Sequence, residues 1–341
     1  MSWMVLLLLP LAVGAQTIPA LLAGAGASGW AAPLLMACPP AGLMAWLGRW
    51  RINNPGVCPS QMAVRCWGAA AGLAVQAVWA LWALAMASYI MHSLSERLVV
   101  TVFPVRSPWP HVAAGLLLCG LMAKGRDPAL FRAAKLFAAG ALGLCGLVLC
   151  FVPQGLQWRY LAPRADNWPA FPGVLPGALA VCSLVIFGFF LLGPVDTGGH
   201  QDPRPRWWQM LTIGPALAVM AAVTMGTFGP ILTASTPSGF FWAIKNAAIP
   251  GGLRIEAIFV MVWLILDLTV VSLLMRAALL FTRRSGWYSA ATAAALVAAG
   301  TLVMGLFDQR TLEALLLWVS AGLMLGLPVL MLLFRQRARI G

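Results

Sequence analysis

The chain has 341 residues, of which 61% are hydrophobic and only 9% are charged, and its net charge is +13. A soluble domain carries about 25% charged residues, so this composition excludes an ordinary soluble protein and indicates a polytopic α-helical membrane protein. An outer-membrane barrel is excluded because the apolar runs do not alternate with polar residues. Nucleic acid is not an expected partner, since Lys and Arg are scattered between apolar runs, where they set topology.

The first apolar run, 3–22, allows two interpretations. Val13-Gly14-Ala15 resembles the cleavage site of a signal peptide, but no positively charged region precedes the run and apolar character resumes at Ile18. We therefore favour a first transmembrane helix. We expect it to be interrupted around 13–17, with Pro19 just beyond, because Gly frees the backbone and Pro removes a hydrogen-bond donor.

Nine further apolar runs bring the expected number of spans to ten. They lie at about 30–47, 67–91, 111–122, 132–152, 173–192, 208–229, 255–281, 287–307 and 312–334. With a cytoplasmic N-terminus, 15 of the 22 Lys and Arg residues fall on the inner side and seven on the outer side. The excess inside predicts that both termini are cytoplasmic.

The sixth span contains a second candidate interruption, Gly188, within a cluster formed by Phe187, Phe189 and Phe190. Ordinary helix packing explains the same residues. However, spans one and six are five apart, and interrupted helices at corresponding positions of two halves indicate a transporter-like binding site.

An aromatic patch, Phe240-Phe241-Trp242, lies in the long connection before the eighth span. Aromatic rings favour the headgroup level of a bilayer, which predicts a short helix lying at the membrane surface. Such a helix is also suited to cap an outward-facing vestibule.

The eighth span, 255–281, carries Asp267 at its middle, ~18 Å from its start at ~1.5 Å per residue. A carboxylate at that depth costs roughly 2.5–3.5 kcal/mol, so we expect it to face protein or a water-filled cavity. It is either an ion- or ligand-coupling group or a structural carboxylate paired with a neighbouring helix. Glu256 is eleven residues earlier and shares its face; a surface pair with Arg254 is the alternative.

Other polar residues point to no cofactor. The three histidines fall near span ends, and none of the seven cysteines forms a C-x-x-C pair, so haem, zinc and a disulfide framework are not indicated. No catalytic triad or phosphate loop occurs, so we do not expect an enzyme. Lys135 on the fifth span is either a topology residue or a coupling group.

Several short motifs carry a family resemblance. They are Gly14-Ala15-Gln16-Thr17-Ile18-Pro19, Ala25-Gly26-Ala27-Ser28-Gly29-Trp30, Ser95-Glu96-Arg97, Phe103-Pro104, Ser107-Pro108-Trp109, Leu161-Ala162-Pro163 and the run from Gly252 to Trp263. With these motifs the chain resembles the B subunit of spore germinant receptors (the GerAB type), in the amino acid–polyamine–organocation superfamily.

The resemblance implies one integral membrane domain, 1–341, with a LeuT-like fold of two inverted five-helix repeats and broken helices one and six. The repeats would cover about 3–152 and 170–307, with a last helix at about 312–334. It also implies a small germinant, typically an amino acid, A- and C-type partner subunits, and the inner spore membrane. In related proton-coupled permeases a lysine on helix five replaces a sodium ion, which keeps Lys135 as a candidate.

An amino acid ligand has a carboxylate, an ammonium and a side chain. Free N–H groups at a half-helix N-terminus near Gly14, Ala15, Gln16 and Thr17 would suit the carboxylate. Phe187, Gly188 and Phe189 would line the side-chain pocket, although packing explains the phenylalanines equally well. Asp267, Glu256 and Lys135 are the expected coupling or gating residues. The alternatives to a receptor subunit are a proton- or cation-coupled amino acid permease and the membrane anchor of a redox complex.

Overall fold

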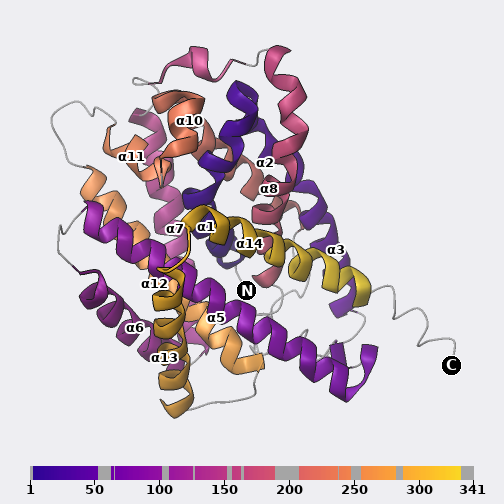
Figure 1. The fold of residues 1–341 in the computed structure, drawn as a ribbon. Helices are drawn as coiled ribbons and strands as arrows, with labels where there is room; N and C mark the ends of the chain where they lie inside the picture. The colour runs from indigo at the N-terminus through magenta and orange to yellow at the C-terminus, as the bar shows by residue number, and fades with distance from the viewer. Residues whose placement is uncertain are drawn as a thin grey trace, which may run out of the picture.

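The computed structural model of the chain describes residues 3–52, 63–64, 66–101, 107–125, 127–151, 156–162, 165–188, 207–236, 238–246, 255–281 and 287–331. Within these ranges the backbone is almost entirely helical and contains no strand (Figure 1). The all-α class expected from the composition is therefore confirmed.

The first half of the chain contains six α-helices and a 3₁₀ segment that matter for the site. They are α1 (Trp3–Leu22), η1 (Ala23–Ala31), α2 (Ala32–Met36), α3 (Cys38–Ile52), α5 (Ala69–Thr101), α6 (Trp109–Lys124) and α7 (Asp127–Phe151). The helices α1 and α5 to α7 overlap predicted spans one and three to five, with α5 extending ten residues beyond the predicted end, and α2 and α3 together cover the second.

Short 3₁₀ segments, η3 (Trp158–Tyr160) and η4 (Ala165–Ala170), connect the two halves. The second half contains α8 (Phe171–Ser183), η5 (Leu184–Ile186), η6 (Trp207–Thr212), α10 (Ile213–Ser235), α11 (Gly239–Lys245), α12 (Ile255–Phe281), α13 (Trp287–Met304), α14 (Gln309–Ala321) and the π-helical turn η7 (Gly322–Gly326). Parts of predicted spans six and ten lie outside the described residues.

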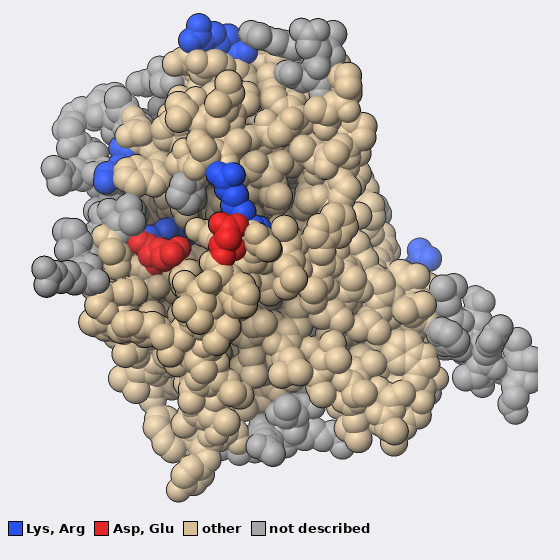
Figure 2. All heavy atoms as spheres, in the orientation of Figure 1, with Lys and Arg blue, Asp and Glu red and all other residues tan. Residues whose placement is uncertain are grey.

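Seven helical stretches of the described chain are long and apolar enough to cross a membrane. The first, Val5–Trp50, is 46 residues long and holds α1 to α3. The chain is therefore a multi-pass membrane protein by helix length and composition. Figure 2 agrees, because charged side chains occupy only small parts of the visible face.

The helix α1 forms the centre of the fold (Figure 1). Apart from Gln16 and Thr17 its residues are apolar on all sides, which is typical of a helix surrounded by other helices, and its side chains from Val5 to Val13 are buried. It packs against α7, α8, α10, α11 and α12. The other helices therefore enclose α1 rather than lying beside it.

The remaining helices pack in pairs taken from the two halves of the chain. α5 lies along α12, α6 along α13, and α2 against both α8 and α10. α5 also packs on α13, and α6 on α12. Close approach is possible at α13 because Gly300 has no side chain: a Cβ there would lie 2.3 Å from Ser88 Oγ of α5.

Candidate functional site

The first helix is not interrupted where the sequence predicted. α1 continues as α-helix through 13–17 to Leu22. The Thr17 hydroxyl donates to the Val13 carbonyl (3.0 Å), and a Cβ on Gly14 would lie 2.2 Å from Leu217 Cδ2. Gly14 therefore allows α1 to pack closely on α10 rather than to unwind, and the prediction of a break here is wrong.

The departure from helical backbone occurs at Gly26, nine residues beyond Thr17, within η1. Gly26 has φ 58° and ψ −143°, a conformation that glycine adopts at low cost. Gly29 follows in the same tight segment, where a Cβ would lie 2.0 Å from the Leu22 carbonyl oxygen. The interruption thus separates α1 from α2 at the end of the first span.

The second predicted break, at Gly188, is also not seen, and this glycine instead lies in close contact with α1. η5 tightens α8 to 3₁₀ geometry, but the backbone torsions at Ser183, Leu184 and Phe187 are all helical. A Cβ on Gly188 would lie 2.1 Å from Leu6 Cδ2 of α1. No backbone break appears in α8 as far as it is described, and Phe189 lies outside the described residues.

The two predicted segments nevertheless come together. α1 packs on α8, with Gly188 beside Leu6, and the Gly14 position is 3.5 Å from Val181 Cγ1. Phe187 is buried and its ring lies 5.1 Å from that of Trp82 on α5, at an interplanar angle of 56°. The predicted ligand residues that are described thus lie on two neighbouring helical segments but at different levels, because Gly188 is level with Leu6, ~15 Å along α1 from Gln16.

Gln16 stands out among these residues. Its side chain is 4% exposed, and neither its amide nitrogen nor its amide oxygen has a hydrogen-bond partner among the described residues. An unpaired buried polar group costs roughly 1–3 kcal/mol, so such groups are rare. By contrast, Ala15 is apolar, and the Thr17 hydroxyl is already bonded to its own helix.

The backbone of 14–17 cannot act as predicted. Inside an α-helix each N–H group bonds to the carbonyl four residues earlier, so these groups do not form a half-helix N-terminus. A ligand carboxylate at this level would instead meet the Gln16 amide, which offers one donor group and one acceptor.

Asp267 is fully buried and paired. The Arg97 Nη2 of α5 donates to its Oδ2, and the Arg97 Nε donates to the Ser93 carbonyl (3.2 Å). The guanidinium carbon lies 4.5 Å from the centre of the Phe241 ring of α11, a cation–π contact. The Asp267 Oδ1 is buried without a hydrogen-bond partner among the described residues.

Asp267 therefore faces protein, as expected. Its partner is Arg97, which the predicted spans had placed in an outer loop. Predicted span three ended at residue 91, whereas α5 continues to Thr101 and carries Arg97 inside the helix. The spacing of Tyr89, Ser93 and Arg97 at i, i+4 and i+8 was the signal that could have placed Arg97 on a helix face.

The helix α11 is present as predicted, but it is not a surface helix with exposed rings. Phe240 and Phe241 are buried. They pack against Phe259 and Trp263 of α12, with ring centres 5.4–6.0 Å apart. The Trp263 indole N–H is buried without a partner among the described residues, one helical turn before Asp267.

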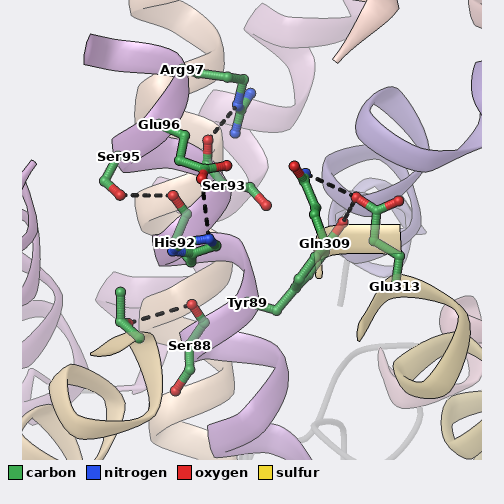
Figure 3. A network of polar contacts seen from close by, with 10 residues as sticks. Ser88, Tyr89, His92, Ser93, Ser95, Glu96, Arg97, Gln309 and Glu313 are labelled. Atoms are coloured by element: carbon green, nitrogen blue, oxygen red, sulfur yellow. Dashed lines mark hydrogen bonds and ion pairs between the residues drawn. The ribbon is translucent and has the colours of Figure 1, made fainter. Parts of the chain in front are cut away.

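A second polar group, missed in the sequence, joins α5 to α14 (Figure 3). Glu313 Oε1 accepts hydrogen bonds from the Tyr89 hydroxyl (3.0 Å) and the Gln309 amide (3.1 Å). His92 Nε2 lies 3.3 Å from Glu96 Oε1 on the same α5 face. Glu313 lies near the start of the last predicted span. A charged residue is common at a membrane boundary, so nothing in the sequence singled Glu313 out as a functional residue.

For the other two predicted coupling residues, Lys135 and Glu256, the described part of the structure shows no contact with Asp267. Lys135 is exposed on α7, and none of the described hydrogen bonds or ion pairs joins it to Asp267. Glu256 lies in the first turn of α12, but its side chain lies outside the described part of the structure.

Comparison with known proteins gives no further assignment: no protein-family model matches the chain, and no curated protein matches it.

Proposed function

We propose that the protein is the membrane subunit of a spore germinant receptor, of the B type, which binds a small germinant in a transporter-like site and triggers germination. The germinant would be an amino acid, and A- and C-type subunits would be its partners in the inner spore membrane, with both termini cytoplasmic. The proposal rests on the motif resemblance and on two features of the structure.

The first feature is a reciprocal pattern of helix packing. Numbered as spans, one packs on six, two on seven, three on eight and four on nine. Further contacts are matched: three packs on nine and four on eight, and one packs on seven and six on two. The contacts of five and of one with eight have no counterparts of comparable extent among the described residues. A two-fold relation between halves requires such reciprocity, because if element i contacts j, then its counterpart contacts the counterpart of j. This pattern supports two five-helix repeats of the LeuT type.

The second feature, which carries the proposal, is the unpaired amide of Gln16 on the enclosed helix α1. Binding pockets are mostly apolar with a small number of polar groups that fix orientation. The Gln16 NH₂ group would donate to the ligand carboxylate and its carbonyl would accept from the ammonium. The apolar lining would come from Val181 and Leu217, which lie at the level of Gly14. Phe187 does not belong to this pocket, because its neighbour Gly188 lies against Leu6, ten residues or ~15 Å along α1 from Gln16.

The decisive experiment replaces Gln16 by methionine, which has a similar shape and no amide. If Gln16 contacts the germinant, Gln16→Met lowers affinity at least roughly tenfold, the effect of about 1.4 kcal/mol of lost hydrogen bonding. Thermal stability should rise, because an unpaired buried polar group is removed. The measurements are germinant response of spores carrying the variant, and binding and unfolding of purified protein.

Thr17→Val is the matched control, since Thr17 is adjacent, equally buried and hydrogen-bonded only to Val13 within its own helix in the described contacts. It should leave the germinant response unchanged. A Gln16→Met protein that is destabilised but responds normally would show that Gln16 is structural, and the proposal would fail. A germinant screen on spores lacking this chain identifies the ligand.

A proton- or cation-coupled amino acid permease is the second candidate, and Asp267 Oδ1 favours it. This oxygen is buried and unpaired among the described residues, at mid-length of a membrane span, where ionisable groups commonly serve ion or proton pathways. Uptake of labelled amino acid into proteoliposomes would support the permease, and its loss in Asp267→Asn would assign coupling to Asp267 only if the variant remains folded. Normal germination with no uptake would support the receptor.

A further inference from the structure

Two polar atoms of α12 are buried without a hydrogen-bond partner among the described residues. They are the indole nitrogen of Trp263 and Oδ1 of Asp267, and both side chains are at most 1% exposed. Unpaired buried polar groups are rare in folded proteins, and within a bilayer no bulk water compensates for them. The two atoms are complementary, because an indole N–H only donates hydrogen bonds and an ionised carboxylate only accepts them.

The residues that carry these atoms are joined by a closed circle of contacts. Trp263 and Asp267 are four residues apart on one α-helix, so they share a face and lie ~6 Å apart along its axis. Arg97 of α5 pairs with Asp267, and its guanidinium carbon lies 4.5 Å from the centre of the Phe241 ring. That ring of α11 lies 5.4 Å, centre to centre, from the ring of Trp263. The two unpaired atoms therefore belong to one region between three helices.

The aromatic side chains beside Trp263 are packed in contact with one another. The ring centres within this group lie 5.3–6.0 Å apart, and all four side chains are buried: Phe240, Phe241, Phe259 and Trp263. Aromatic rings at such separations touch. A solute with more than a few heavy atoms would have to separate them, so the region suits only a very small ligand.

The chemistry of the region restricts that ligand further. A metal cation needs oxygen ligands, whereas here it would meet the indole N–H and the positive charge of Arg97. An ammonium group cannot accept from the indole, and an anion would lie beside the Asp267 carboxylate. A water molecule both accepts and donates. Two hydrogen bonds of ~2.9 Å through one water also span the ~6 Å between successive helical turns.

We propose that Trp263 and Asp267 bind one internal water, which accepts from the indole N–H and donates to Asp267 Oδ1. Buried waters in proteins typically make two to four hydrogen bonds to polar groups that otherwise have no partner. The water completes the surroundings of the carboxylate, whose Oδ2 is bonded to Arg97. The site does not depend on the nature of the germinant. In a permease it would make a proton, rather than a metal cation, the ion that reaches Asp267.

The first test removes only the indole N–H. In the whole protein, suppression of an amber codon replaces Trp263 by its benzothiophene analogue, which keeps the shape of the side chain and has sulfur in place of N–H. Loss of a hydrogen bond to water should lower the Tm, whereas loss of an unpaired donor should not. A Tm that rises or stays unchanged would overturn the proposal.

Trp82 provides the matched control for this measurement. It is also buried, and its indole N–H donates to the Ser320 hydroxyl (2.9 Å). The same analogue at position 82 should lower the Tm, which calibrates the effect of losing one buried indole hydrogen bond in this protein.

The second test distinguishes a water from a direct hydrogen bond between the two side chains. It is an experimental structure of the whole protein in nanodiscs and sodium chloride, at a resolution that shows ordered waters. We expect a density peak within ~3.2 Å of both the Trp263 nitrogen and Asp267 Oδ1. A direct bond between the side chains with no such peak, or a peak ~2.0–2.6 Å from Oδ1 as for a metal cation, would overturn the proposal.

Discussion

Arg97 and Asp267 form an ion pair between α5 and α12 although they lie 170 positions apart in the chain. The carboxylate is fully buried and the arginine side chain is 10% exposed. Burial of two charges is costly, and only a close pair with further hydrogen bonds offsets that cost. Here the Ser93 carbonyl and the Phe241 ring complete the surroundings of the guanidinium.

Removing one member of this pair should be worse than removing both. Asp267→Asn leaves Arg97 buried without its counter-charge and should destabilise the protein by roughly 3–5 kcal/mol. Replacement of both by apolar residues, Arg97→Met with Asp267→Leu, should recover most of the loss. Thermal unfolding of the purified variants provides the measurement. A double variant no more stable than Asp267→Asn would contradict a paired role.

The glycine in α1 should act through packing rather than through flexibility. Gly14→Ala places a methyl group against Leu217, which is itself fully buried, and should cost about 1–3 kcal/mol of stability. Gly140→Ala on α7 is the control: nothing lies within 4 Å of its Cβ position, so helix propensity should raise stability by up to ~1 kcal/mol. If Gly14→Ala is as well tolerated as Gly140→Ala, the close contact with α10 is not limiting.

The hydrogen bond between Tyr89 and Glu313 should couple α5 to α14. Tyr89→Phe and Glu313→Gln, each measured alone and together by thermal unfolding, should give an interaction free energy on the order of 0.5–3 kcal/mol. Tyr89→Phe with Thr292→Val is the control pair, because the Thr292 hydroxyl is exposed and bonds to Tyr288 of its own helix. That pair should be additive, and additivity in both pairs would exclude coupling through Glu313.

The start of α14 should depend on pH through Asp308. Its carboxylate accepts the Thr311 N–H (3.0 Å) and the Thr311 hydroxyl (3.1 Å), and these bonds lower its pKa from the ordinary 3.8. A lowered pKa in the folded state means that the stabilisation is present above about pH 3.8 and is lost as pH falls through the folded pKa. Asp308→Asn retains an N-cap but cannot titrate. The difference in Tm between the two proteins should therefore change below about pH 4 and stay constant above it.

The sequence by itself determined the class of protein and the limits of some of its long helices, although α5 runs ten residues beyond the predicted end. The bounds of α1 and α12 agree with the predicted 3–22 and 255–281, because apolar runs of membrane length end at Pro, Gly or charged residues. The burial of Asp267 also followed from the sequence, because a carboxylate in the middle of such a run has few other places to lie.

Only the tertiary structure decided how individual side chains act. From the sequence alone, a glycine that interrupts a helix cannot be told from a glycine that allows a neighbouring helix to approach closely. The positions of Leu217 beside Gly14 and of Leu6 beside Gly188 show that both glycines have the second role. Likewise, the sequence alone suggests that Arg97 only sets topology, whereas the packing of α5 on α12 places it beside Asp267. Hydropathy is a property of each segment alone, whereas a contact between helices depends on the rotation and depth of both, which packing of the whole chain sets.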